Sequence, residues 1–277
     1  MIQEIRNHDV LGRLLWMTDG KTEVAIALDF GIRVMHLSCA GKENLFYLQP
    51  EDLSDGVAEP NGWRLYGGHR FWLSPESDAS YFPDNSPVSY RLLEDGVEVT
   101  QEKDPLLGVI KSITLRFLSN GAIEVTHHIQ NVLQKEMTVA LWGINTLIGG
   151  EVEVGFSANP QHIFTPNRVV SLWGKTNLGD PRVKFESERL LAWHGPSDDD
   201  FKIGIFSYDG RAVYQNLGQQ LTITFEALSP EMYSDLGCNF ELFMNNYFME
   251  LETLGIKHTL LPGDCASHKE VWQVTNI

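Results

Sequence analysis

The chain has 277 residues, of which 43% are hydrophobic and 21% are charged, and its formal net charge is −16. This composition is typical of a folded globular protein. Because the large negative charge repels phosphate backbones and anionic lipid surfaces, we expect neither nucleic acid nor a membrane as a partner.

The first 16 residues, MIQEIRNHDVLGRLLW, lack the basic, apolar and small-residue segments of a secretory signal. No apolar run approaches the roughly 20 residues needed to span a bilayer. Cys39, Cys238 and Cys265 are an odd number of cysteines without metal-ligand or redox spacing. They indicate buried thiols in a reducing compartment rather than a disulfide framework. We therefore expect a cytoplasmic protein.

Strand patterns dominate from the start of the chain. Between residues 12 and 39, short β-rich runs are separated by Asp19-Gly20 and Phe30-Gly31, which predicts strands joined by hairpins. The same alternation returns further on, with tight-turn signals at Glu94-Asp95-Gly96 and Ser119-Asn120-Gly121. These segments predict antiparallel hairpins rather than parallel crossover units.

After Gly150 the pattern continues in runs such as RLLAWHG and QLTITFEAL. No stretch of a dozen residues carries a helical period, and well over a dozen short strands are spaced by turn residues. This predicts an all-β fold, a large antiparallel β-sandwich or barrel. Since no low-complexity linker or fixed repeat interrupts the chain, we expect one domain over residues 1–277.

The stretch LYGGHRFWLSPE, from Leu65 to Glu76, is the first candidate for chemistry. Paired glycines let a backbone bend or approach a ligand closely, because they lack a Cβ. On this interpretation His69, Arg70 and Trp72 enter a cleft at the end of a strand. The alternative is a bulged strand with a core Trp and surface charges.

The second candidate is the strand NYFMELETLG, in which Glu250 and Glu252 share a face with Phe248. Met249 and Leu251 on the opposite face are apolar, so one side of this strand is packed and the other is acidic. An acidic strand face inside a concave sheet is a place for a base. The alternative is a solvent-facing edge.

Other positions are more ambiguous. His127 alternates with apolar residues, which favours a hydrogen-bonded core residue, and His128 is expected to be exposed. Trp142 is either core or a flat platform for a sugar. Lys202 is either a solvated charge or a group that reaches a hydroxyl-rich ligand. Phosphate-binding loops, nucleophile elbows and zinc-type His/Cys spacing are absent from the sequence, so it predicts neither a cofactor nor a metal.

The order of four segments resembles the galactose mutarotase-like superfamily, the aldose 1-epimerase type of β-sandwich. The segment YGGHRFWLSPE is most similar to an uncharacterised branch that reads Gly-Gly-His-Arg-hydrophobic-Trp. The resemblance spans nearly the whole chain and implies a supersandwich fold. The four segments are GKTEVAIALDFGIRVMHLSCAGKENLF, YGGHRFWLSPE, IEVTHHIQNVLQKEMTVALWGINTL and YFMELETLGIKHTLLPGDCASHKEVWQV.

The resemblance also implies a function. In aldose 1-epimerases a strand carboxylate takes the proton of the anomeric hydroxyl while a histidine protonates the ring oxygen, which opens the hemiacetal. Glu250 matches the carboxylate, with Glu252 as the alternative, and His69 is the candidate acid. His69 and Glu250 would then flank one sugar ring, roughly 5 to 9 Å apart.

The expected ligand is a small carbohydrate held in a concave cleft. Arg70 and Lys202 would bind its hydroxyls or a carboxylate, with Trp72 and Trp142 as stacking platforms. The family's histidine after the Asn hairpin is replaced here by Trp142, so sugar binding is better supported than epimerisation. The alternative function is a noncatalytic module that recognises a sugar or sugar acid.

Overall fold

The computed structural model describes every residue except 50, 53–61 and 160–163. The fold is built almost entirely from two antiparallel β-sheets, as the alternating sequence predicts. In the described residues the first sheet has ten strands. In spatial order they are β1 (Ile2–His8), β2 (Gly12–Thr18), β3 (Thr22–Ala27), β4 (Arg33–Cys39), β5 (Gly68–Ser74), β10 (Met137–Ile148), β19 (Phe248–Leu260), β18 (Phe240–Met244), β15 (Phe201–Ile205) and β12 (Val170–Leu172).

The second sheet also has ten strands within the described part of the chain. They follow the spatial order β13 (Val183–Phe185), β14 (Arg189–Trp193), β11 (Glu151–Gly155), β16 (Arg211–Asn216), β17 (Gln219–Phe225), β20 (Cys265–Asn276), β9 (Ile123–Asn131), β8 (Val109–Phe117), β7 (Gly96–Thr100) and β6 (Ser89–Leu93). Among the residues that the structure describes, two 3-10 helices, η1 (Asp78–Tyr81) and η2 (Pro230–Met232), lie in the connections.

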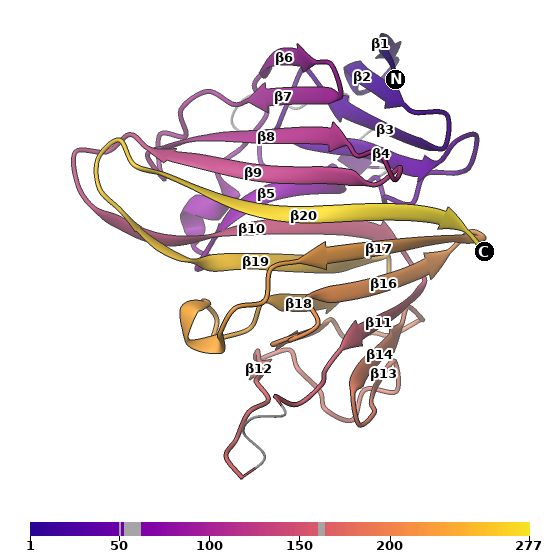
Figure 1. Cartoon of the computed structure of the whole chain (residues 1–277), viewed down its shortest axis with the longest axis vertical. Coiled ribbons are helices and arrows are strands. Elements are labelled where there is room, and N and C mark those ends of the chain that lie inside the picture. Colours follow the sequence, from indigo (N-terminus) through magenta and orange to yellow (C-terminus); the bar gives the residue numbers. More distant parts are fainter. Residues whose placement is uncertain (50, 53–61, 160–163) are drawn as a thin grey trace.

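The two sheets pack face to face, and the main core lies between them. In Figure 1, β9 and β20 of the second sheet overlie β10 and β19 of the first, and contacts join these strands across the interface. The core takes alternate residues from each strand, as period two requires. Phe71, Leu141 and Leu251 come from the first sheet and Val125 and Trp272 from the second.

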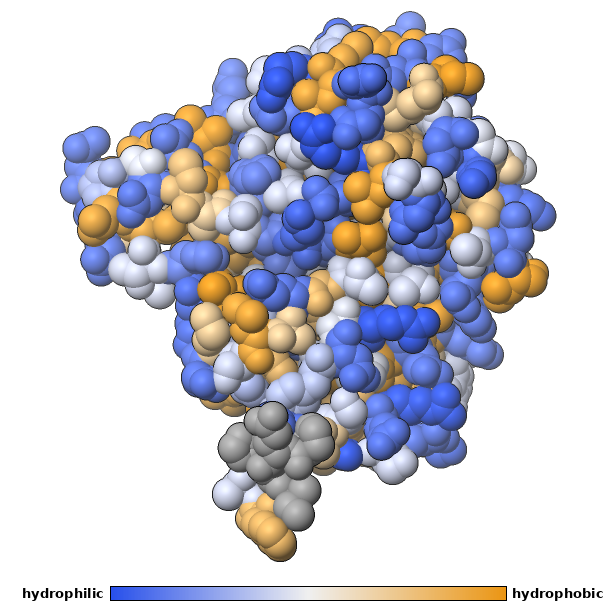
Figure 2. Space-filling model, in the orientation of Figure 1, coloured by the Kyte–Doolittle hydropathy of each residue, from blue (hydrophilic) through white to orange (hydrophobic). Residues whose placement is uncertain are grey.

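The second sheet turns its other face outward. Along β8, the buried residues Ile113 and Leu115 alternate with the less buried Ser112, Thr114 and Arg116. Hydrophilic residues predominate on the molecular face seen in Figure 2, and the apolar residues there are scattered. This sheet therefore has one packed face and one polar face, the usual arrangement in an antiparallel sandwich.

The middle of the first sheet is different, because its strands are buried on both faces. All seven residues of β5 and all five of β15 are buried, and so are the first eight of β19. A sandwich strand normally has one exposed face. The second buried face must therefore be covered by loops, and this is where the candidate site lies.

The paired glycines at the start of β5 bring three segments of backbone together. Gly67 and Gly68 have φ angles of +86° and +73°. A Cβ on Gly67 would lie 2.0 Å from the Tyr47 carbonyl oxygen, and one on Gly68 would lie 2.3 Å from the Val34 carbonyl oxygen. The glycines do permit a close approach, but the partner is backbone of this chain rather than the ligand that the sequence suggested.

The cysteines are free, but they do not share one environment. Cys39 and Cys238 are buried as predicted, whereas Cys265 is exposed at the start of β20. The expectation of a buried thiol is wrong for Cys265, because it occupies a solvent-facing position of its strand. Within the described residues, no helix is long and apolar enough to cross a membrane.

Candidate functional site

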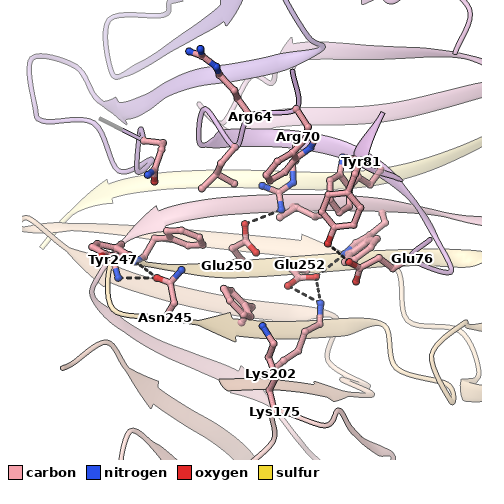
Figure 3. Close-up of a pocket in the computed structure, with 18 of the residues that line it drawn as sticks. Arg64, Arg70, Glu76, Tyr81, Lys175, Lys202, Asn245, Tyr247, Glu250 and Glu252 are labelled. Carbon is pink, nitrogen blue, oxygen red and sulfur yellow. Dashed lines mark hydrogen bonds and ion pairs between the residues drawn. The ribbon is translucent and has the colours of Figure 1, made fainter. Parts of the chain in front are cut away.

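A cavity of about 780 Å³ lies over the outer face of the first sheet, the face turned away from the second sheet. Figure 3 shows charged side chains at its centre, with Glu250 and Glu252 side by side. The floor comes from β5, β10, β19, β18 and β15. Loops supply the walls, with Trp63, Arg64, Glu76, Tyr81, Trp173, Lys175 and Tyr247 among the lining residues.

Strand register brings the floor residues together from distant parts of the sequence. Ile144 on β10 pairs with Arg70 on one side and Glu252 on the other. One step along the sheet, Glu250 pairs with Phe243 of β18. The core-facing neighbours Met249 and Leu251 confirm that the two glutamates share a face. Period two therefore places both carboxyl groups in the cavity.

Glu250 is held from one side by two donors. An Arg70 Nη2 atom lies 3.1 Å from Glu250 Oε1, and Thr146 Oγ1 donates a hydrogen bond to the same oxygen at 3.0 Å. Arg70 also stacks on Trp72, its guanidinium carbon 4.6 Å from the ring centroid. Within the described residues Glu250 Oε2 has no hydrogen-bond partner, which leaves this oxygen available to a ligand.

A second charged group, which we call the lysine trio, consists of Lys202, Glu241 and Glu252. Lys202 Nζ lies 2.7 Å from Glu241 Oε2 and 2.9 Å from Glu252 Oε2. Trp142 donates its indole N–H to Glu252 Oε2 at 2.9 Å. The ammonium also sits 4.8 Å from the centroid of the Trp142 ring, so the tryptophan contacts both charges.

Burial sets the protonation of the lysine trio. Burial, together with the nearby carboxylates of Glu241 and Glu250, raises the pKa of Glu252 to about 8 against the lowering effect of Lys202. Burial also raises the pKa of Glu241. Although burial lowers the pKa of Lys202, the two glutamates raise it above its ordinary value, so the lysine stays charged.

His69 does not lie in the cavity, and its predicted place beside Glu250 is wrong. It is fully buried on the core face of β5, next to Phe71, while Arg70 and Trp72 face the cavity. The physical reason is the period of a strand. Consecutive side chains point to opposite faces, so His69 and Arg70 cannot both enter one cleft.

His69 instead forms a hydrogen-bonded pair with His127 between the sheets. The two Nε2 atoms are 2.8 Å apart, and His69 Nδ1 lies 3.0 Å from Asn145 Oδ1. The prediction that His127 is a hydrogen-bonded core residue is confirmed. His128, expected to be exposed, is half-buried, because neighbouring strands partly cover the outer face of β9.

In the described part of the chain, one group of His and Glu side chains is close enough to be considered for a metal. Ligand atoms of His69, His127 and Glu270 all lie within 4.8 Å of one another. The two imidazole centroids are 5.0 Å apart, so with Nε2 atoms 2.8 Å apart the rings meet head-on. Two nitrogens on one zinc ion would instead lie roughly 3.3 Å apart at a tetrahedral angle. The observed geometry is that of a hydrogen bond, and we assign no metal to it.

Sequence reasoning missed several residues of the site. Trp63, Tyr81 and Trp173 line the cavity, and Glu241 completes the lysine trio beneath it. Glu241 carried a signal, because it lies between Phe240 and Leu242 in a strand that is otherwise apolar. The loop aromatics carried no periodicity that could have singled them out.

The remaining predicted residues come together. Arg70, Trp72, Trp142, Lys202, Glu250 and Glu252 all line the same cavity, although they come from four strands of the sheet. Six of the seven predicted site residues therefore line one cavity, and His69 is the exception. Lining the cavity does not by itself assign a chemical role to any of them.

Neither the scan against protein-family models nor the search of curated proteins found a match. Solved structures do match. A galactose mutarotase-like protein from Lactobacillus casei has a TM-score of 0.62 at 12% identity, over 95% of this chain and 100% of that one. The fold is that of the galactose mutarotase-like β-sandwiches.

Two further structures agree over nearly the whole chain. The Slr1438 protein from Synechocystis has a TM-score of 0.61 at 11% identity, over 100% of this chain and 96% of that one. A galactose mutarotase related enzyme from Lactobacillus acidophilus has a TM-score of 0.55 at 10% identity, over 95% and 97%. Such low identities establish the mutarotase-like fold alone. The branch with a Gly-Gly-His-Arg-hydrophobic-Trp segment remains a prediction.

Proposed function

We propose that the cavity over the first sheet binds a small carbohydrate. The observation that carries this proposal is the combination of four tryptophans with two charged groups in one cavity of about 780 Å³. A sugar has apolar C–H faces and a rim of hydroxyl groups. Indole rings suit the faces, and carboxylates and cations suit the hydroxyls. The mutarotase-like fold of the chain supports the same ligand class.

The aromatic and the charged residues of the cavity would have different roles. Trp72 and Trp142 provide aromatic surface, while Arg70 and Lys202 orient the carboxyl groups of Glu250 and Glu252. Glu250 Oε2 would accept a hydrogen bond from a sugar hydroxyl. Because each charge is already paired within the protein, the site favours a neutral polar ligand over a strongly charged one.

Titration calorimetry with a panel of monosaccharides and uronic acids tests this proposal. We expect at least one sugar to bind, and Glu250→Gln to weaken that binding. Glu136→Gln, at an exposed turn, is the matched control and should bind as the unchanged protein does. If no member of the panel bound, or if Glu250→Gln bound equally well, the proposal would be wrong.

A second candidate function is aldose 1-epimerisation, favoured by the two carboxyl groups on one strand face. In this reaction Glu250 would act as the base that takes the anomeric proton. Polarimetry of a freshly dissolved α-anomer separates the two functions. An enzyme speeds the approach to anomeric equilibrium, whereas a noncatalytic recognition module leaves the rate unchanged.

A further inference from the structure

The two glutamates of β19 stand at a spacing suited to a single sugar ring. Glu250 and Glu252 are two residues apart on one strand face, so their Cα atoms are separated by roughly 6.6 Å. This Cα spacing is of the same order as the separation of roughly 5 to 9 Å between carboxyl groups that act across a pyranose. Both side chains line the cavity. A ring bound between them could therefore exchange a proton with each.

The two carboxyl groups have unlike partners. Glu250 faces the guanidinium of Arg70, which gives one negative and one positive charge. Glu252 shares its single cation, Lys202, with Glu241. If both of these glutamates were ionised, the lysine trio would keep an uncompensated negative charge at a buried position, which is costly. One proton on the trio makes it neutral.

The contacts around Glu252 indicate which of its two oxygens would carry this proton. Trp142 and Lys202 both direct donors to Glu252 Oε2, at 2.9 Å each, while Oε1 has only the longer 3.1 Å contact with Lys202. A protonated Glu252 would therefore carry its hydrogen on Oε1. Glu241 does not line the cavity. It lies below Lys202, with the Cys238 thiol 3.5 Å from its other oxygen.

We propose that Glu252 is the general acid of anomer interconversion at this site, that Lys202 is a positioning residue that holds its carboxyl group in place, and that Glu241 is a positioning residue that keeps it protonated by taking up the charge of Lys202. This inference rests on the proposed carbohydrate function and on its catalytic form. Glu252 would take the place of His69 as the general acid, because His69 lies on the other face of the sheet.

The proton balance closes without a cofactor. Glu250 takes the proton from the anomeric hydroxyl, the C1–O5 bond breaks, and O5 takes the proton of Glu252. The product is the open-chain aldehyde. After rotation about C1–C2, O5 attacks the other face of the carbonyl and returns its proton to Glu252, while the carbonyl oxygen recovers a proton from Glu250. Both carboxyl groups end in their starting states.

The charged groups around Glu252 shift the balance between its protonated and ionised forms. Lys202 of β15 favours the ionised form, while Glu241 of β18 and Glu250 of β19 favour the protonated one. Arg70 of β5 compensates Glu250. Because the pKa of Glu252 is about 8, the acid should be lost, and the rate should fall, as pH rises through about 8.

The first test is Glu252→Gln, measured by polarimetry for rate and by calorimetry for binding. We expect sugar binding within a few-fold of the unchanged protein and a rate that falls by roughly 10² to 10⁴, the usual worth of a positioned acid. Glu136→Gln serves as the control for both measurements. A full rate in Glu252→Gln would overturn the inference.

The second test is Glu241→Gln, because this residue touches no ligand. With one carboxyl group left for one ammonium, Glu252 should ionise more readily, so the fall in kcat/KM should move to lower pH while the rate recovers in mildly acidic buffer. A merely structural role would lower the rate without moving the profile. An unmoved profile would overturn the part assigned to the trio, and this test stands even if Glu252→Gln fails to fold.

Two outcomes distinguish a wrong assignment of Glu252 as the acid from a wrong proposal of carbohydrate binding. If the unchanged protein binds a sugar but does not speed anomer exchange, the acid assignment is wrong and carbohydrate binding stands. If it binds no sugar and catalyses no exchange, the proposed function itself is wrong.

Discussion

Arg70 acts at the residue scale as the partner of Glu250 and as a cation stacked on Trp72. Its side chain and that of Glu250 are almost fully buried, and Arg70 Nε and Nη1 have no hydrogen-bond partner in the described structure. Arg70 neutralises a carboxylate that is largely shielded from water.

Arg70→Ala should therefore reduce both ligand affinity and stability. Loss of a hydrogen bond to a charged group weakens sugar binding by roughly 1.5 to 3 kcal/mol. Removing one partner of a buried ion pair lowers the free energy of unfolding by about 3 kcal/mol. Urea unfolding measures the second effect, and Arg70→Ala combined with Glu250→Gln should recover part of it. A double variant no more stable than Arg70→Ala alone would argue against the ion pair as the cause.

The histidine pair predicts a dependence of stability on pH. Burial lowers the pKa of His69 to about 3, against the raising effect of Asn145, and it lowers the pKa of His127 well below the ordinary value. In the unfolded chain these imidazoles take up protons near pH 6.5. The unfolded state therefore binds more protons below that pH, so stability is complete above about 6.5 and falls as the solution becomes more acidic.

Melting temperatures measured between pH 7.5 and 5 test this expectation. His69→Asn should show a smaller loss over the range than the unchanged protein, because one buried imidazole is gone. His8→Asn, at an exposed position of β1, should leave the slope as it was. A slope that is the same in all three proteins would rule out the histidine pair as its source.

At the element scale, the two faces of β5 have different neighbours. Its Arg70 and Trp72 face the cavity, while His69 and Phe71 face the core. The glycines at its start let the strand begin against the backbone of two other segments. Both faces of the strand are thus occupied, which explains why every residue of β5 is buried.

The glycine pair predicts a graded response to alanine. Gly67→Ala places a Cβ 2.0 Å from the Tyr47 carbonyl oxygen, so the backbone must move. Gly41 has a similar φ of +73°, and a Cβ there meets nothing within 4 Å. We expect Gly41→Ala to cost about 1 kcal/mol from the left-handed backbone alone and Gly67→Ala at least twice as much. Equal costs in denaturant unfolding would show that the contact with Tyr47 is unimportant.

At the scale of the whole molecule, the first sheet joins strands from both ends of the chain. β10 lies between β5 and β19, so residues near 70, 142 and 252 become neighbours. We propose that residues 1–277 form one domain. Strands that share a sheet and a core in this way should lose their structure together.

One cooperative unfolding transition should therefore be observed. Circular dichroism and tryptophan fluorescence should give coincident curves in denaturant, because the tryptophans and the strands belong to one core. Two resolved transitions would contradict a single domain.

Much of the architecture was predictable because it depends on local periodicity. Alternation with period two predicted the strands and put Glu250 and Glu252 on one face, opposite Met249 and Leu251. The glycine pair indicated a point where the backbone could bend or be approached closely. These features need only the stereochemistry of neighbouring residues, so the sequence alone carries them.

What the tertiary structure decided is which face of each strand meets the core and which strands become neighbours. Period two separates His69 from Arg70 but does not say which of them enters the cavity, because that depends on the position of the second sheet. The lysine trio joins β15, β18 and β19 through pairing and burial. The raised pKa values of Glu241 and Glu252 follow from desolvation at the meeting point of three strands, a property that none of the three segments has by itself.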